Sequence, residues 1–327
     1  MLILADQVRE DEREYFEEFA KEYGLEIRLN EDMTDIAALE SFPEPAGYSV
    51  LGMHHYGPEQ MALLASKNIK YLSTRTIGHD HIDLDAARKY GVSVCNVAYG
   101  PNGVADYTVM MILLCLRKYK QALWRMQVND FSLQGLLGRE LADLTVGVLG
   151  TGRIGSAVIR ELSGFRCRLI AYDKFRDPET EKYAEYVPFD TILEESDVIT
   201  LHLPLLPETR HIINSHTIAM MKDGVVIINC ARGPLADIKA LTEGIETEKI
   251  GALGVDCIET EEKFVHQDLK TAIIHNPDIA YLKQFKNVVY TQHMAFYTDT
   301  AVRDMVKYGV LGILQMARGE ECPTRLV

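Results

Sequence analysis

The chain has 327 residues, of which 47% are hydrophobic and 25% charged, and its formal net charge is −14. This length suggests about two domains, and the composition is that of an ordinary globular protein. Proteins that bind nucleic acids or anionic membranes present clustered Lys and Arg, so the negative charge argues against both kinds of partner.

The sequence also bears on compartment and metal content. No apolar run reaches the roughly 18 residues that span a bilayer, and the first residues lack the basic start and long apolar stretch of a secretory signal. The six cysteines lie far apart, without a C-x-x-C spacing. Reduced, buried thiols are therefore expected rather than disulfides or a metal site. Together these features predict a cytoplasmic protein with no bound metal.

Short apolar runs alternate with helical patterns along the chain, which is typical of an α/β fold. In the first part, a helix containing Phe16, Phe19 and Tyr23 is expected to end at Gly24. Residues 104–120 predict one long, largely buried helix. The strands predicted in this part cover residues 2–5, 26–29, 49–53, 71–74 and 93–97.

A second series of strands begins at Thr145. Its runs are apolar throughout rather than alternating, as expected for a parallel sheet covered on both faces. We predict one sheet domain before about residue 99 and a second from about residue 100 to 295, followed by a helix over 301–318. The strands predicted in the second series lie within residues 145–150, 168–173, 197–204, 225–231, 251–257 and 287–293.

The first strand of the second series leads into a glycine motif, G-x-G-x-x-G, formed by Gly150, Gly152 and Gly155. A helical pattern over 153–163 follows directly, which is the context of a dinucleotide-binding turn. In such a turn the first glycine permits the tight bend, the second lets the backbone approach the pyrophosphate, and the third lets helix and strand pack closely. The motif therefore predicts a nicotinamide dinucleotide as cofactor.

The choice between NAD and NADP depends on Asp173, which ends the next strand, about 20 residues farther along. A carboxylate there would accept both ribose hydroxyls of the adenosine and would repel a 2′-phosphate. Lys174 and Arg176 lie close in sequence and could soften that preference. We expect NAD.

Three further segments end successive strands of the second series, where open α/β sheets place their ligands. They carry Arg232, then Asp256 and Glu261, then His293. A guanidinium matches the geometry of a substrate carboxylate, and His is the natural general acid near neutral pH. A carboxylate behind the His would orient its ring. This combination is suited to the reduction of a 2-oxo acid.

Each of these residues has a more ordinary explanation when it is taken alone. An Arg after an apolar strand usually lies in a surface ion pair, Glu261 belongs to a charged run, and a lone His is more often structural. Their joint placement at strand ends, after a dinucleotide motif in its proper context, favours the functional interpretation.

Longer motifs carry a family resemblance. They are TRTIGHDHID (74–83), NVAYGPNGVADYT (96–108), GVLGTGRIG (147–155), MKDGVVIINCARGPLAD (221–237) and HMAFYT (293–298), with LHLPL and VDCIETE between them. Over nearly the whole chain they resemble the NAD-dependent D-2-hydroxyacid dehydrogenase family, most closely its D-lactate dehydrogenases, including the vancomycin-resistance type. The family commonly has Pro before the catalytic His, where this chain has Gln292.

The resemblance implies two doubly wound parallel-sheet domains in a homodimer: a flavodoxin-like substrate domain (1–99 plus 296–327) and a Rossmann NAD-binding domain (100–295). It implies that Arg232 holds the substrate carboxylate and carbonyl, that His293 is the acid–base and that Glu261 pairs with it. It further implies substrate contacts for the backbone of Ile77 and Gly78 and for Tyr99 and Tyr297, and cofactor contacts for Gly150, Gly152, Arg153, Ile154, Gly155, Asp173, Pro204, Ala231 and Asp256.

The expected reaction is the reversible, NAD-dependent reduction of a small 2-oxo acid, pyruvate first, to the D-2-hydroxy acid. The resemblance places substrate specificity near Met53, His54 and His55, and no Lys or Arg occurs from residue 41 to 66, which favours monocarboxylates. A D-2-hydroxyacid dehydrogenase for a larger 2-oxo acid and a non-catalytic, NAD-sensing corepressor-like module remain alternatives. A formate or glycerate enzyme fits the HMAFYT segment less well.

Overall fold

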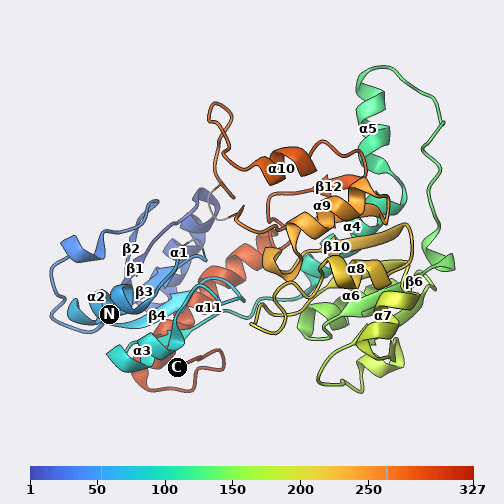
Figure 1. The fold of residues 1–327 in the computed structure, drawn as a ribbon. Coiled ribbons are helices and arrows are strands. Elements are labelled where there is room, and N and C mark those ends of the chain that lie inside the picture. The colour runs from blue at the N-terminus through green and yellow to red at the C-terminus, as the bar shows by residue number, and fades with distance from the viewer. Residues whose placement is uncertain (53, 262–263) are drawn as a thin grey trace. The chain divides into compact units, whose positions relative to one another are not determined.

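The computed structural model describes residues 1–52, 54–261 and 264–327, and the chain divides into two compact units (Figure 1). The first unit consists of Met1–Gly100 and Tyr297–Val327, and the second of Pro101–Phe296. In the part of the chain that is described, no helix combines the length and the apolar character needed to cross a membrane.

The first unit is built on a five-stranded sheet in the order β2-β1-β3-β4-β5, and all neighbouring strands are parallel. This is the flavodoxin-like order, whose switch point lies between the first and third strands. The elements of this unit are β1 (Leu2–Ala5), α1 (Glu10–Tyr23), β2 (Glu26–Leu29), a 3₁₀ turn η1 (Ile36–Ala38), β3 (Ala46–Val50), α2 (Pro58–Ser66), β4 (Ile69–Thr74), α3 (Leu84–Tyr90), β5 (Ser93–Cys95) and α11 (Asp299–Arg318).

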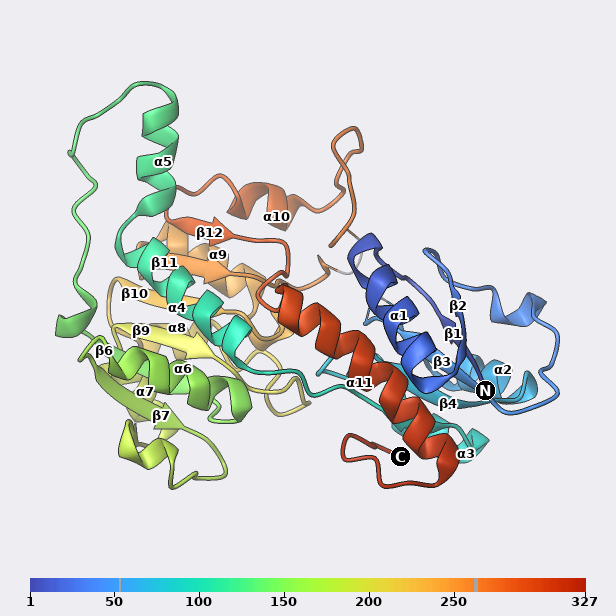
Figure 2. The same cartoon turned by 180° about the vertical axis from the view of Figure 1, so that it is seen from behind.

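Side chains of this sheet alternate between two cores on its opposite faces, because successive residues of a strand point in opposite directions. Ile3 of β1 packs in a core with residues of α1 and α11, whereas the next residue, Leu4, packs with residues of α2 and α3. Figure 2 shows α1 and α11 side by side over one face. Helix α1 ends at Gly24, which takes the left-handed conformation (φ 66°) expected of a glycine C-cap.

The second unit is built on a seven-stranded parallel sheet in the order β12-β11-β10-β9-β6-β7-β8. This is the Rossmann order with one added strand, and its switch point lies between β6 and β9. Its strands are β6 (Thr145–Leu149), β7 (Arg168–Tyr172), β8 (Glu185–Tyr186), β9 (Val198–Leu201), β10 (Val225–Asn229), β11 (Ile250–Val255) and β12 (Val288–Tyr290).

Helices cover both faces of this sheet, so the predicted fold class of two doubly wound sheets is confirmed. Ile227 of β10 packs in the core formed with α7, α8 and α9, and the next residue, Ile228, packs with α4 and α6. The helices are α4 (Asn102–Leu116), α5 (Tyr119–Gln127), α6 (Arg153–Ser163), α7 (Phe189–Glu195), α8 (Ser215–Met220), α9 (Ile238–Glu246) and α10 (Pro277–Leu282), with 3₁₀ turns η2 (Leu141–Asp143), η3 (Thr180–Lys182) and η4 (Gly233–Leu235).

The single long helix predicted over 104–120 is wrong. Helix α4 ends at Leu116, Lys118 takes a left-handed conformation (φ 50°), and α5 begins at Tyr119 in a new direction (Figure 2). Helix α4 is buried on most sides, but none of the side chains of α5 is buried. The helical sequence pattern continues from α4 into α5. Helix α5 lacks the buried contacts that would hold it as a straight continuation of α4.

Two strand predictions also need correction. The strand expected at 49–53 covers Ala46–Val50, and Met53 lies outside the described residues. The short edge strand β8 was not predicted, because its two residues, Glu185 and Tyr186, form no apolar run.

Candidate active site

The predicted dinucleotide turn lies at the switch point of the second sheet. Gly150 has φ 94°, and a Cβ on it would lie 2.6 Å from the carbonyl oxygen of His202, which follows β9. A Cβ on Gly155 would collide with the carbonyl oxygen of Gly150, so strand and helix can pack this closely only through glycine. A Cβ on Gly152 meets no atom of the described chain within 4 Å. The turn therefore leaves open space where a pyrophosphate would approach.

The N-terminus of α6 suits an anion. Its N-cap, Gly152, has no side chain to accept the first N–H groups of the helix, and Gly152 and Arg153 are exposed. Unpaired N–H groups and the positive end of the helix dipole favour a phosphate at such a terminus. Taken with the glycine turn, these features fit a dinucleotide.

Asp173 stands directly beside this turn, at the end of β7. Its carboxylate accepts hydrogen bonds from the backbone N–H groups of Thr151 (2.6 Å) and Phe175 (2.9 Å), which leaves lone pairs for further donors. The two nearby cations have other contacts: Lys174 pairs with Glu208 at 3.0 Å, and Arg176 lies over the ring of Tyr186.

The loop after β10 carries Arg232 and is organised by Asn229. The Asn229 side chain accepts a hydrogen bond from the N–H of Ala231 (3.0 Å) and donates one to the carbonyl of Arg232 (2.8 Å). The Arg232 guanidinium also donates to the Ala231 carbonyl at 2.8 Å. A Cβ on Gly233 would collide with the backbone of Ile258. The Arg232 loop therefore packs directly on the loop that follows β11.

That neighbouring loop carries Glu261, which pairs with His293. The two side chains lie 2.7 Å apart, from Glu261 Oε1 to His293 Nδ1. The other carboxylate oxygen accepts a hydrogen bond from the Ile258 N–H at 3.0 Å. Because a carboxylate is an acceptor, His293 Nδ1 carries the proton of this bond, and Nε2 is the ring nitrogen that can exchange a proton with a substrate.

The backbone around His293 depends on Asp256, which is 1% exposed. The Asp256 carboxylate accepts hydrogen bonds from the Thr291 hydroxyl (2.6 Å) and from the N–H groups of Met294 (3.0 Å) and Ala295 (2.8 Å). Its carbonyl accepts the His293 N–H at 2.7 Å. His293 has φ 55°, a conformation that costs a non-glycine residue about 1–3 kcal/mol. These bonds hold it there.

The Cys257 thiol lies among the charged groups of this site. Burial raises its pKa well above the usual value, the charges of Glu261, Cys230 and Asp256 raise it further, and Arg232 lowers it.

The structure thus brings Arg232, Asp256, Glu261 and His293 together, as their positions at successive strand ends predicted. Within the described ranges, no group of three or more His, Cys, Asp or Glu side chains is arranged to hold a metal ion.

In the first unit, the segment with Ile77 and Gly78 follows β4. The Thr76 carbonyl accepts a hydrogen bond from the N–H of Val97 (3.4 Å), and the Ile77 carbonyl accepts one from the Asn96 side chain (2.6 Å). Across a trans peptide the N–H points opposite to the C=O. The N–H groups of Ile77 and Gly78 therefore point away from the β5 segment.

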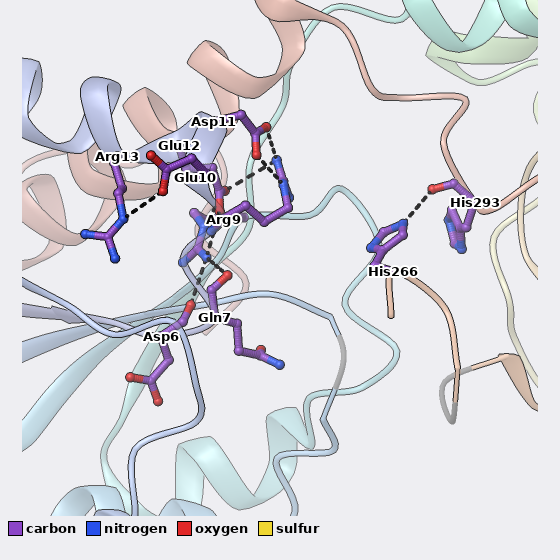
Figure 3. A network of polar contacts seen from close by, with 10 residues as sticks. Asp6, Gln7, Arg9, Glu10, Asp11, Glu12, Arg13, His266 and His293 are labelled. Carbon is purple, nitrogen blue, oxygen red and sulfur yellow. Dashed lines mark hydrogen bonds and ion pairs between the residues drawn. The ribbon is translucent and has the colours of Figure 1, made fainter. Parts of the chain in front are cut away.

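Tyr297 and Tyr99 also belong to the first unit. Tyr297 is 47% exposed, and the Arg9 guanidinium lies over its ring, 5.4 Å from the centroid. Asp11 joins the two, because it accepts hydrogen bonds from Arg9 at 3.0 and 3.1 Å and from the Tyr297 hydroxyl. Figure 3 shows the Arg9 and Asp11 side chains of this network. Tyr99 is 8% exposed.

Reasoning from sequence missed Asn229 and Thr291, whose side chains organise the Arg232 and His293 loops. The sequence feature that could have indicated them is their position, because each is a polar residue at or just beyond the end of an apolar strand.

Comparisons with known proteins agree with this architecture. Residues 109–295 match the family model "D-isomer specific 2-hydroxyacid dehydrogenase, NAD binding domain". The chain is 41% identical to an aromatic 2-oxoacid reductase of Clostridium sporogenes, covering 100% of this chain and 99% of that one. It is 38% identical to a D-specific alpha-keto acid dehydrogenase of Enterococcus faecium (95% and 96%). A crystal structure of a D-lactate dehydrogenase from Treponema pallidum superposes with a TM-score of 0.87 at 31% identity, with full coverage of both chains.

Gly152→Ala should weaken NADH binding by at least about tenfold without harming the fold, since a methyl group there faces the space beside the anion-binding terminus rather than protein atoms. Fluorescence titration would give the dissociation constant and thermal unfolding the stability. Gly164→Ala, at the far end of the same helix, is the matched control. Unchanged NADH affinity in Gly152→Ala would contradict the assigned position of the pyrophosphate.

Proposed function

Because the chain belongs to the family of D-isomer-specific 2-hydroxyacid dehydrogenases and is an NAD-dependent enzyme of that family, we propose that it reduces small 2-oxo monocarboxylates, pyruvate first, to the D-2-hydroxy acids. The observation that carries this proposal is the Glu261–His293 pair beside the Arg232 loop. NADH, when bound, supplies the hydride that reaches the carbonyl carbon.

Substrate binding and proton transfer depend on three side chains of the second unit. Arg232 binds the substrate carboxylate and polarises the carbonyl, since its planar donors match both oxygens. His293 gives the proton on Nε2 to the developing alkoxide and takes it back in the reverse direction. Glu261 fixes the ring through Nδ1 and stabilises the protonated imidazole.

For the first unit, we propose that the N–H groups of Ile77 and Gly78 bind the substrate carboxylate and that Tyr99 and Tyr297 line the substrate pocket. The direction of those two N–H groups, away from β5, supports the first assignment. The residues proposed to hold NAD are Gly150, Gly152, Arg153, Ile154, Gly155, Asp173, Pro204, Ala231 and Asp256.

The proposed contact between Asp256 and the nicotinamide carboxamide has one constraint. The Asp256 carboxylate already accepts three hydrogen bonds from the His293 segment, and a carboxylate offers about four acceptor positions. This leaves about one acceptor position for a carboxamide N–H donor.

His293→Ala should lower kcat by roughly 10²- to 10⁴-fold, the range that general acid–base catalysis contributes. Glu261→Gln should keep more activity, because the amide oxygen can still accept the hydrogen bond from Nδ1 but the neutral side chain no longer stabilises the charged ring. Steady-state rates with NADH measure both, and His216→Ala, an exposed residue of α8, serves as the control. Near-normal turnover in His293→Ala would refute its role as proton donor.

The preference for monocarboxylates follows from the charges near the switch point of the first sheet. The loops after β1, β3 and β4 contain two arginines, Arg9 and Arg75. Arg9 pairs with Asp11, and Arg75, fully buried, pairs with Glu12 at 3.0 Å. A second substrate carboxylate would meet cations that already have carboxylate partners, and burying it unpaired would cost several kcal/mol.

A 2-oxo acid with a larger side chain is the second candidate substrate. Aromatic 2-oxoacid reductases of Clostridium sporogenes are 41% identical to this chain over its whole length. An aromatic 2-oxo acid is also a monocarboxylate, so the charge argument applies to it equally.

The kcat/KM for pyruvate should exceed that for 2-oxoglutarate by at least about 10²-fold, which corresponds to about 2.8 kcal/mol. Assays with NADH near neutral pH would compare pyruvate, 2-oxobutyrate, phenylpyruvate and 2-oxoglutarate, and chiral analysis would test for the D product. A higher value for phenylpyruvate than for pyruvate would favour the aromatic candidate. A higher value for 2-oxoglutarate would overturn the monocarboxylate proposal.

We also propose that the chain forms a homodimer through α5 and the segment after it. This part of the second unit exposes Trp124 (69%), Phe131 (70%), Leu133 (83%) and Leu137 (87%). Figure 2 shows α5 and this segment extending beyond the sheet. Large apolar side chains exposed along one segment in this way favour an interface, and a second copy presents the same segment, as twofold symmetry requires.

Light scattering should give twice the 36.9 kDa mass of the chain. The double variant Leu123→Asp/Trp124→Asp should shift the protein to the monomer, because carboxylates are costly in an apolar interface. Ile273→Asp, at an exposed apolar residue before α10, is the control. A monomeric wild-type protein at micromolar concentration would refute the proposal.

A further inference from the structure

A second histidine, His266, approaches the proposed proton donor within the second unit. Its Nε2 lies 3.1 Å from the carbonyl oxygen of His293, as Figure 3 shows. The two rings meet edge to face, with centroids 6.4 Å apart, and the His266 ring also lies 6.2 Å from that of Phe296.

The direction of this hydrogen bond is fixed by its acceptor. A backbone carbonyl has no proton to give, so His266 Nε2 must carry one and donate it. The neutral imidazole with a proton on Nε2 suffices, and the bond does not require a charged ring.

This bond completes the restraint of residue 293. Its N–H donates to the Asp256 carbonyl at 2.7 Å, and its Nδ1 donates to Glu261 at 2.7 Å. With His266 on the carbonyl, the N–H, the carbonyl and the Nδ1 of His293 each have a partner in the second unit. The restraint is needed, because His293 adopts a left-handed conformation that side-chain-bearing residues rarely take.

Two of these three restraints come from Glu261 and His266, which lie close together in the sequence. The Glu261 carbonyl accepts hydrogen bonds from the N–H groups of Phe264 (3.0 Å) and Val265 (2.8 Å). Val265 is buried, and Phe264 packs against the core of the unit. Glu261 thus contacts the ring of His293 and His266 contacts its carbonyl, and the residues just before His266 are fixed by hydrogen bonds and packing.

We propose that His266 is a positioning residue that fixes the backbone of His293, so that Nε2 stays aligned for proton transfer. This inference rests on the proposed role of His293 as proton donor. The His266 side chain is exposed, so without the bond water solvates the carbonyl, and stability should change little. The loss should appear in the rate of the chemical step.

The test compares His266→Phe, which keeps an aromatic ring but has no donor, with His266→Gln, whose amide N–H can reach the carbonyl. His266→Phe should lower kcat by about tenfold, less than the roughly 10²-fold that an ångström of misplacement can cost. KM for NADH and the melting temperature should stay unchanged. The solvent deuterium isotope effect on kcat should rise, because proton transfer becomes more rate-limiting. His266→Gln should restore both quantities, and His275→Ala, an exposed histidine of the same loop, is the control.

His293→Ala is measured in parallel to separate the two proposals. If His293→Ala is inactive but His266→Phe matches the wild type in rate and isotope effect, the positioning role is refuted and the proposed function stands. If His266→Gln is as slow as His266→Phe, the hydrogen bond is not the cause and the proposal is equally overturned. Near-normal turnover in His293→Ala would refute the proposed function itself.

Discussion

The buried carboxylate of Asp256 is the interaction on which the geometry of the site depends. It lies at the end of β11, 1% exposed, and accepts three hydrogen bonds from the segment that follows β12. A buried charge without partners would be strongly destabilising, so the segment cannot leave this carboxylate at low cost. In this hydrogen-bonded segment, the backbone of His293 adopts a left-handed conformation. One acidic residue in the core thereby fixes the backbone of the proposed proton donor.

The parallel sheet explains why the other groups converge on the same place. The carboxyl ends of β10, β11 and β12 lie next to one another, because these strands are neighbours in the sheet. Arg232, Glu261 and His293 each follow one of these ends. Close approach then depends on one small residue, since any side chain at Gly233 would push the Arg232 loop away from the backbone of Ile258. The three side chains proposed for catalysis thus come from short loops on a rigid support.

Several features could be predicted from the sequence because each has one physical cause. Uninterrupted apolar runs predict parallel strands buried on both faces, and the fold and family predicted from them and from the longer motifs are confirmed. Gly150 and Gly155 occupy positions that no other residue could fill.

The break between α4 and α5 could not be predicted, because it reflects missing packing around α5 rather than a change in periodicity. Asn229 and His266 act through hydrogen bonds to backbone groups, whose directions a sequence does not specify.

Gln292 illustrates how the same restraint can be reached by different means. A proline at this position would fix one backbone dihedral of the segment through its ring, and glutamine provides no such restriction. In this chain hydrogen bonds hold the segment, from Thr291 on one side of Gln292 and from residues 293–295 on the other. A ring restrains one bond rotation permanently, whereas a hydrogen-bonded network restrains several residues and depends on all its members. The loss of one partner of such a network should therefore loosen the backbone around His293 as well as the lost contact itself.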